Sequence, residues 1–142
     1  MLTITAIGAH PDDIEIFMYG FLAVCRDRGD QINLIVATDG AAGGAEPGPE
    51  LACRRAGEAR DGLQHLGVPR LLDLPDGRLA ETGGAAGMVR EAIASTSPDL
   101  ILTHAPEDYH PDHRALSAMV ADAASFRCPI LFADTLLSLI HI

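Results

Sequence analysis

The stretch that decides the fold is LTITAIGAHPDD, residues 2–13. Residues 2–7 alternate β-branched and other apolar side chains, which is typical of a strand, and Gly8 bounds that run. Asp12 or Asp13 is then expected to open a helix, because a carboxylate there accepts hydrogen bonds from unpaired N–H groups and meets the positive end of the helix dipole. The stretch therefore predicts an α/β fold whose first strand passes directly into a helix.

The rest of the chain repeats this alternation of strand and helix. Further strands are expected at residues 31–37, 71–74, 99–104 and 130–133. Helices are expected at residues 12–28, 50–66, 85–95 and 113–125. Because no internal repeat or linker interrupts the pattern, it predicts one α/β domain built on a parallel, doubly wound sheet with helices on both faces.

Composition and charge exclude several classes of protein. The chain has 142 residues, of which 48% are hydrophobic, enough for one domain with a real core. No apolar run reaches about 18 residues and no basic segment precedes the first apolar stretch, so neither a membrane span nor a secretory signal is expected. Twenty acidic residues against ten basic ones give a formal charge of −10. Such a surface repels nucleic-acid phosphates and anionic lipids, so we expect neither as a partner.

The cysteines indicate a reducing environment. Cys25, Cys53 and Cys128 are odd in number, far apart and in no C-x-x-C arrangement. The pattern is typical of a cytoplasmic protein with incidental thiols, and a cysteine as a metal ligand is the minor alternative. Homo-oligomerisation is left open by the sequence.

Two clusters of metal-binding side chains follow two of the expected strands. His10, Asp12 and Asp13 come after the first strand, and His110-Pro111-Asp112-His113 comes after the fourth. In an open parallel sheet, ligands bind outside the carboxyl ends of the strands. We therefore expect the two clusters to form one site.

The clusters supply three ligands for one metal ion. His10 and Asp13, three residues apart at the start of a helix, point the same way, and His113 is the expected third ligand. Zinc takes imidazole nitrogen and carboxylate oxygen, and a catalytic site keeps one position open for water. Coordination lowers the pKa of that water to about 7, so the remaining carboxylate, Asp12, suits a general base. Iron(II) would fit two histidines and one carboxylate equally well.

The second cluster also offers a proton donor. His110 lies one helical turn before His113, so it is expected to face the same cavity, with Asp112 orienting or charge-stabilising its imidazole. The plainer alternative is that Asp13 only caps one helix while Asp112 and His113 only begin another. Two such clusters at matching strand ends favour the metal site.

Several further residues are candidates for the surroundings of the site. Arg54 and Arg55 lie near the start of the helix that follows a glycine-rich loop. Helical arginines are usually solvated, but either one is a candidate to bind a polar or anionic group of a substrate. Asp108 and Tyr109 are candidates to line the mouth of the cavity. His104 is expected to end its strand nearby, in a supporting role rather than as a ligand.

The motifs and their order resemble the PIG-L/LmbE-like deacetylase family. The segments that carry the resemblance are AHPDD (9–13), TDG (38–40), R-x-x-E (55–58), LG (66–67), TH (103–104), HPDHR (110–114) and ADTL (133–136). The resemblance implies a Rossmann-like α/β/α sandwich over residues 1–136. Family members usually continue for some tens of residues into elements that wall the substrate pocket. The domain is therefore expected to be incomplete at its C-terminal end, with residues 137–142 as a tail outside it.

The resemblance also implies an activity, the zinc-dependent removal of the N-acetyl group from an N-acetylglucosamine-containing small molecule or conjugate. By motif position it assigns the same three metal ligands and the same general base, Asp12. It gives His110 the tasks of stabilising the oxyanion and protonating the leaving amine, with Asp112 in support. It matches either Arg54 or Arg55 to a substrate-contacting arginine. Two alternatives stay open: an amidase for a larger acyl group or a thiol-sugar conjugate, and a non-catalytic metal- or sugar-binding module.

Overall fold

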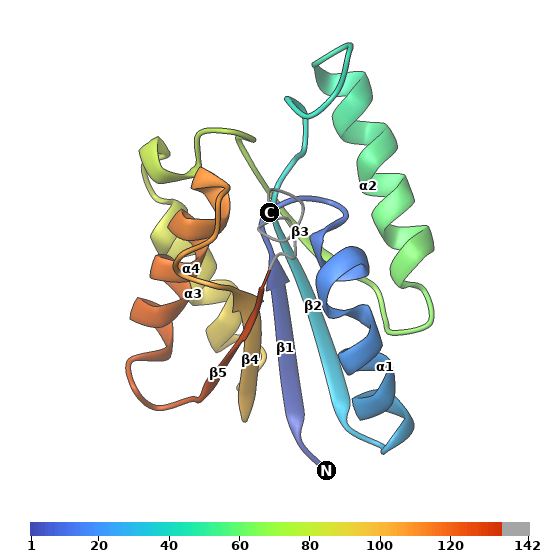
Figure 1. Cartoon of the computed structure of the whole chain (residues 1–142), viewed down its shortest axis with the longest axis vertical. Helices are drawn as coiled ribbons and strands as arrows, with labels where there is room; N and C mark the ends of the chain where they lie inside the picture. The colour runs from blue at the N-terminus through green and yellow to red at the C-terminus, as the bar shows by residue number, and fades with distance from the viewer. Residues whose placement is uncertain (135–142) are drawn as a thin grey trace, which may run out of the picture.

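Among the residues that the structure describes, five strands form one sheet between two layers of helices, which is a three-layer α/β/α sandwich (Figure 1). This computed structural model describes residues 1–134. The expected domain end at residue 136 and the expected tail at residues 137–142 lie outside the described residues. Within the described part, none of the helices combines the length and apolarity that a membrane crossing demands.

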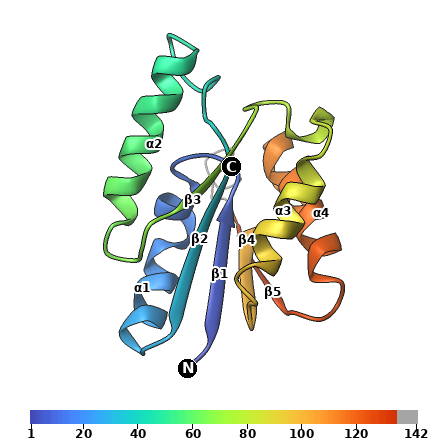
Figure 2. The same cartoon turned by 180° about the vertical axis from the view of Figure 1, so that it is seen from behind.

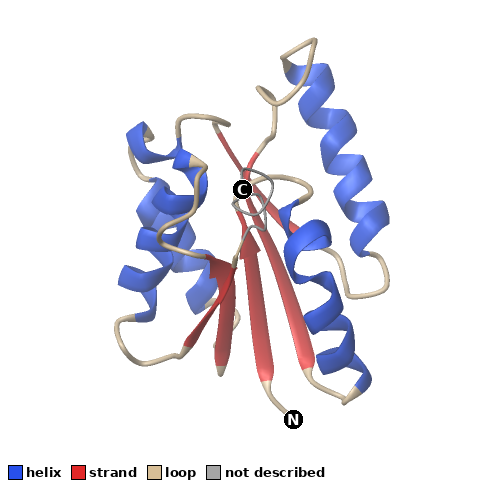
Figure 3. Cartoon of the chain, viewed as in Figure 1, coloured by secondary structure: helices blue, strands red, loops and turns tan. Residues whose placement is uncertain are grey.

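The strands, red in Figure 3, agree with the sequence prediction to within one residue at each end. They are β1 (Thr3–Gly8), β2 (Gln31–Thr38), β3 (Arg70–Leu74), β4 (Leu100–His104) and β5 (Ile130–Ala133). The sheet order is β3-β2-β1-β4-β5, and every neighbouring pair is parallel. The predicted parallel, doubly wound sheet is confirmed.

The helices are divided evenly between the two faces of the sheet. They are η1 (Ile14–Met18), α1 (Tyr19–Asp27), α2 (Pro49–Leu63), η2 (Leu79–Glu81), α3 (Ala85–Ala94) and α4 (Pro111–Ala124), where η1 is a π-helical turn and η2 a 3₁₀ turn. Helices α1 and α2 cover one face, and α3 and α4 cover the other, as the views from front and back show (Figures 1 and 2).

The two faces of β1 belong to two separate cores because side chains alternate along a strand. Ile4 is fully buried in the core that includes Leu22 of α1. Ile7 is fully buried in the core that includes Val89 of α3 and Leu116 of α4. A strand buried on both faces is typical of the centre of a parallel sheet, and this places β1 in the middle of the molecule.

The burial of Leu22 in the α1 core predicts that this side chain contributes strongly to stability. Leu22 is 0% exposed, whereas Val24 on the same helix is 69% exposed. We expect Leu22→Ala to lower the free energy of unfolding by about 2–5 kcal/mol, because it removes buried apolar surface and leaves a cavity. Val24→Ala should change it by no more than about 0.5 kcal/mol. Urea denaturation of both variants measures the difference, and equal losses would contradict this packing.

The first helix differs from the single helix expected from residue 12 or 13 onwards. A π-helical turn, η1, comes first, and the α-helix begins only at Tyr19. Asp13 stands at the N-cap position but makes no side-chain cap hydrogen bond. Its carboxylate instead accepts the backbone N–H of His10 at 2.6 Å. Such π turns are frequent at functional sites, and this one leads directly away from the first cluster.

Helix α4 begins at Pro111, two residues earlier than predicted. Proline is well suited to the first helical position, because the N–H that it lacks would have no helical partner there. The preceding residue, His110, caps the helix with its side chain: Nδ1 accepts the N–H of Asp112 at 3.1 Å. An imidazole thus takes the place of the usual N-cap oxygen.

The strand order brings the two clusters to the same crevice. From β1 the chain adds β2 and β3 on one side and then crosses over to β4, on the other side of β1. Open α/β sheets bind ligands outside the carboxyl ends of the strands at such a switch point. His10 follows the end of β1 and His110 follows the end of β4. The fold therefore joins parts of the chain that are a hundred residues apart in the sequence.

Candidate metal centre

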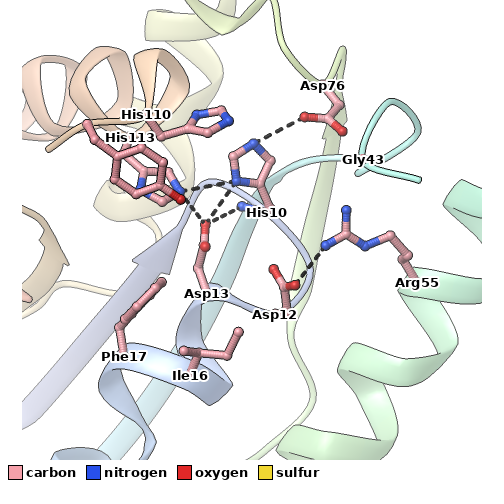
Figure 4. A pocket seen from close by; sticks show the side chains of 11 residues that line it. His10, Asp12, Asp13, Ile16, Phe17, Gly43, Arg55, Asp76, His110 and His113 are labelled. Carbon is pink, nitrogen blue, oxygen red and sulfur yellow. Dashed lines mark hydrogen bonds and ion pairs between the residues drawn. The ribbon is translucent and has the colours of Figure 1, made fainter. Parts of the chain in front are cut away.

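Asp13 contacts three buried histidines, two of which, His10 and His113, are drawn beside it in Figure 4. Its Oδ2 lies 3.3 Å from His10 Nδ1, 3.1 Å from His104 Nε2 and 3.3 Å from His113 Nε2. Burial raises the pKa of this carboxyl, but hydrogen bonds from the three histidines outweigh it and hold the pKa well below its usual range. Asp13 is therefore a carboxylate at neutral pH.

The three residues expected as ligands place their atoms in a nearly equilateral triangle. His10 Nδ1 and His113 Nε2 are 3.2 Å apart, and Asp13 Oδ2 is 3.3 Å from each. The centre of the triangle, in its plane, lies about 1.9 Å from each atom, close to the 2.0–2.2 Å at which zinc binds nitrogen and oxygen. The donor types and their spacing fit a small divalent cation.

Other groups of donor atoms near the triangle could also surround an ion. Within the described residues they are His10 with His110 and His113, Asp13 with His104 and His113, and His10 with Asp76 and Asp112. Each group shares at least one residue with the triangle, so all belong to one centre rather than to separate sites.

His104 packs against two residues of the triangle, Asp13 and His113. It is fully buried, and its ring stacks on that of His113 with centroids 3.7 Å apart and planes 9° apart. Its Nε2 lies 3.0 Å from the backbone nitrogen of Ala9 and 3.1 Å from Asp13 Oδ2. Whether this nitrogen accepts from Ala9 or donates to Asp13, it is engaged within the protein.

Asp108 contacts Nδ1 of His113, the ring nitrogen that is not part of the triangle. Its Oδ1 lies 3.1 Å from His113 Nδ1 and accepts the backbone N–H of His110 at 2.9 Å. Burial lowers the pKa of His113, but the carboxylates of Asp13 and Asp108 outweigh it and raise that pKa. A carboxylate behind one ring nitrogen leaves the other nitrogen for a metal. Asp108, 4% exposed, thus lies behind His113 and not at the cavity mouth where the sequence placed it.

Asp12 lies beside the triangle and is paired with Arg55. Arg55 Nη2 is 2.9 Å from Asp12 Oδ2, and Arg55 Nη1 donates to the carbonyl oxygen of Gly40 at 3.3 Å. Both side chains line the same cavity, as Figure 4 shows. Arg54 is exposed on α2 and is not one of the lining residues. Of the two arginines expected near the site, Arg55 is the one that the fold brings to it.

Two glycines make room for Arg55. Gly40 has a φ of +67°, and a Cβ atom there would lie 2.8 Å from Pro11 Cδ and 3.1 Å from Arg55 Nη1. At Gly43 a Cβ atom would lie 2.7 Å from Arg55 Nη1. A larger residue at position 43 would therefore have to displace the guanidinium group.

His110 faces the cavity as a hydrogen-bond donor. Its Nδ1 accepts the N–H of Asp112, so the ring proton is assigned to Nε2. Burial and the neighbouring charges of His10 and His113 lower the pKa of His110. At neutral pH the ring is therefore uncharged and offers one N–H to the cavity.

The carboxylate of Asp112 contacts His10, whereas the sequence paired it with His110. Its Oδ2 lies 3.2 Å from His10 Nε2 and accepts the N–H of Gly77 at 2.7 Å. Its Oδ1 accepts the N–H of Leu79 at 3.0 Å. Asp112 does orient His110, but through its main chain, because the His110 ring lies over the first turn of α4.

Asp76 is a site residue that the sequence analysis missed. It follows β3 at the same edge of the sheet, and its Oδ1 lies 3.1 Å from His10 Nε2. Burial lowers the pKa of His10, but the carboxylates of Asp13, Asp76 and Asp112 outweigh it and raise that pKa to about 9. The one available signal was a carboxylate just after a strand, which the Pro-Asp-Gly context makes look like an ordinary turn.

The side chains around the triangle line a cavity of about 440 Å³ that opens to solvent. Ile16 and Phe17 of η1 form an apolar part of its wall. Tyr109, 58% exposed, also lines it, as the sequence predicted. The remaining lining residues are His10, Asp12, Asp13, Gly43, Arg55, Asp76, His110 and His113.

The family of this chain follows from a sequence match that includes the residues of the metal centre. The model of the PIG-L family, described as GlcNAc-PI de-N-acetylase, matches residues 5–124. The chain belongs to the PIG-L family. The PIG-L match includes both clusters, and it ends before β5.

Two deacetylases are similar to this PIG-L chain. Diacetylchitobiose deacetylase of Thermococcus kodakarensis is 31% identical over an alignment of 131 residues, and the match covers 87% of this chain and 49% of that protein. The solved structure of N,N'-diacetylchitobiose deacetylase from Pyrococcus horikoshii, complexed with its inhibitor MPG, has a TM-score of 0.79 and 27% identity, and the match covers 87% of this chain and 49% of that one. The chain thus spans about half the length of these relatives.

The fold by itself extends beyond deacetylases. 4-Carboxy-2-hydroxymuconate hydratase from Pseudomonas putida KT2440 has a TM-score of 0.77 with 18% identity, covering 88% of this chain and 56% of that one. At that identity only the fold is shared. Any activity of this PIG-L chain has to be argued from the residues of its site.

Proposed function

We propose that the protein is a metal-dependent hydrolase that removes the N-acetyl group from an N-acetylglucosamine unit of a small molecule or conjugate. The observation that carries this proposal is one cavity in which a triangle of metal-ligand atoms lies beside Asp12 and His110. The similarity to two diacetylchitobiose deacetylases favours an amino-sugar substrate.

Zinc is the ion that we propose for the triangle, held by His10, Asp13 and His113. Two imidazole nitrogens and one carboxylate oxygen suit zinc and leave a coordination position open, although the same donors suit iron(II). When bound, such an ion supplies Lewis-acid activation of water and of a carbonyl oxygen. Metal analysis of the purified protein, followed by reconstitution with each ion, identifies the metal that supports turnover.

The side chains beside the triangle provide the proton transfers. We propose that Asp12 takes a proton from the attacking water, because its carboxylate lies in the cavity outside the triangle and is held by Arg55 at 2.9 Å. The Nε2–H of His110 donates a hydrogen bond to the developing oxyanion. Because this ring is uncharged at neutral pH, the leaving nitrogen takes its proton from Asp12, which gained one from the water, and not from His110 as the family resemblance implies. The carbonyl carbon gains a bond to oxygen and loses its bond to nitrogen, which releases acetate and a free amine. Each such acid–base group typically contributes about 10²- to 10⁴-fold to the rate.

Two residues at the cavity wall are proposed to contact the sugar. Arg55 presents a guanidinium group, and Tyr109 presents a ring and a hydroxyl group, both suited to sugar hydroxyls. Arg54 and Asp108 are less suited, because the first is exposed on α2 and the second is buried behind His113.

The proposal is tested by following acetate and free amine released from N-acetylglucosamine and from N,N'-diacetylchitobiose, with added zinc and with a chelator. A deacetylase releases both products in equal amounts and loses activity with the chelator. Faster cleavage of an N-butanoyl or a thiol-sugar analogue would instead indicate an amidase for other acyl conjugates. Binding of the sugars without release of acetate would indicate a non-catalytic binding module.

We also propose a reducing compartment such as the cytoplasm. Cys25, Cys53 and Cys128 are all free thiols in the structure. Free cysteines are usual in compartments where glutathione and thioredoxin keep thiols reduced. Fractionation of the native host and thiol counting on the extracted protein test this placement.

Gly43→Ala is expected to lower turnover by up to about 100-fold, because misplacing a catalytic group by about an ångström has effects of that size. The added methyl would lie 2.7 Å from Arg55 Nη1 and would push the guanidinium group away from Asp12. Stability should change little, since the atom displaced is the end of a flexible side chain. Gly57→Ala on α2, where the space is open, is the control and should keep full activity. Rates for both variants, with thermal denaturation, decide the prediction.

A further inference from the structure

We propose that Asp76 is a positioning residue for the metal centre: it holds the proton of His10 on Nε2 and so directs Nδ1 towards the metal. This inference rests on the metal-binding site proposed above. It adds a residue that follows β3 to the two clusters that follow β1 and β4.

The two nitrogens of His10 face different surroundings. Nε2 lies 3.1 Å from Asp76 Oδ1 and 3.2 Å from Asp112 Oδ2. Nδ1 lies 3.2 Å from His113 Nε2 and 3.3 Å from Asp13 Oδ2, within the triangle. A metal in the triangle needs the lone pair of Nδ1, so the remaining ring proton has to sit on Nε2. Ionised carboxylates only accept hydrogen bonds, and two of them are placed to receive that proton.

The carboxylate of Asp76 is itself fixed. Its side chain is 7% exposed, and its Oδ2 accepts the backbone N–H of Ala42 at 2.9 Å. Its own backbone N–H donates to Asp39 Oδ1 at 3.3 Å. A carboxylate whose residue is held at the backbone N–H and at one side-chain oxygen presents the other oxygen to His10 in one direction.

Asp112 builds the turn that presents Asp76. Its two oxygens accept the N–H groups of Gly77 and Leu79, the residues just after Asp76. Because Asp112 shares its carboxylate between this turn and His10, removing it would disturb several contacts at once. Asp76 directs Oδ1 at the imidazole, so it is the better residue on which to test the positioning of His10.

A competing role for Asp76 is contact with the substrate, because the residue also lines the cavity. The two roles differ in what happens without substrate. Loss of a carboxylate behind a metal-binding histidine typically weakens metal affinity by about 10- to 100-fold. A residue that only touches the substrate would raise KM and leave metal affinity unchanged.

The experiment is a zinc titration of metal-free protein against a competing colorimetric chelator, with no substrate present. We expect Asp76→Ala to weaken zinc binding by about 10- to 100-fold. Asp76→Asn should fall between it and the wild type, because an amide oxygen still accepts from Nε2. Glu91→Gln, which removes an exposed carboxylate from α3, is the matched control and should bind zinc as the wild type does.

A second measurement does not depend on any variant. In zinc-loaded wild-type protein, nitrogen-15 NMR of the imidazoles should show the proton of His10 on Nε2 and the metal on Nδ1. The opposite arrangement would overturn the inference, and so would equal zinc affinities of Asp76→Ala and the wild type. If the wild type binds no zinc or iron(II) at all, the proposed function fails together with this inference. If the wild type binds zinc and the Asp76 variants bind it equally tightly, the proposed function stands and the inference alone fails.

Discussion

Asp12→Asn is expected to keep the bound metal and to lose about 10²- to 10⁴-fold in kcat, the range usual for removal of a general base. The amide has nearly the same shape as the carboxylate but cannot accept a proton from water. Asp12 lies outside the ligand triangle, so the metal ligands are untouched. Steady-state rates and metal content, measured on the same preparation, test both halves of the prediction.

The matched control for Asp12→Asn is Asp61→Asn, the same chemical change on the exposed face of α2. It should keep both metal and activity. If Asp12→Asn lost its metal as completely as a ligand variant does, Asp12 would be a ligand and not the base. Unchanged kcat would show that another group takes the proton.

His113→Ala should lose the ion and the activity together. His113 supplies one corner of the triangle, with its Nε2 3.2 Å from His10 Nδ1 and 3.3 Å from Asp13 Oδ2. Removing even a supporting partner of a ligand costs about 10- to 100-fold in affinity, so removing the ligand itself should weaken metal binding by more than about 100-fold. Zinc titration and acetate release measure the two effects.

The control for this variant is His65→Ala, because His65 is exposed and distant in sequence from both clusters. It should match the wild type in metal affinity and in rate. Tight metal binding by His113→Ala would contradict the assignment of the triangle. Thermal denaturation of the metal-free proteins shows whether His113→Ala still folds, since the change also removes one of the contacts of Asp108.

Most of the fold was predictable because it depends on local patterns. The strands are short apolar runs, and their side chains fill the cores on both faces of the sheet. The position of the site was also predictable, because parallel strands of an open sheet bring their carboxyl ends to one edge. The local departure, the π-helical turn after Asp13, arises because that carboxylate binds His10 and the other histidines instead of capping the helix.

The finer assignments depend on directions that a sequence does not contain. Arg54 and Arg55 are neighbours on one helix, and only the packing of α2 shows that Arg55 faces Asp12. Asp108 and Tyr109 are neighbours in one loop, yet the first is buried behind His113 and the second lines the cavity. Asp76 reaches His10 because Asp112, from a different strand-to-helix junction, shapes the turn that holds it.

The central claim is that an ion held by His10, Asp13 and His113 supports deacetylation by this chain. It is tested most directly by adding zinc or iron(II) stepwise to metal-free protein while acetate release from N,N'-diacetylchitobiose and bound metal are measured on the same sample. We predict that the rate rises in proportion to bound metal and levels off at one ion per chain. Acetate release that is independent of bound metal would contradict the account, and so would a fully loaded protein that releases no acetate.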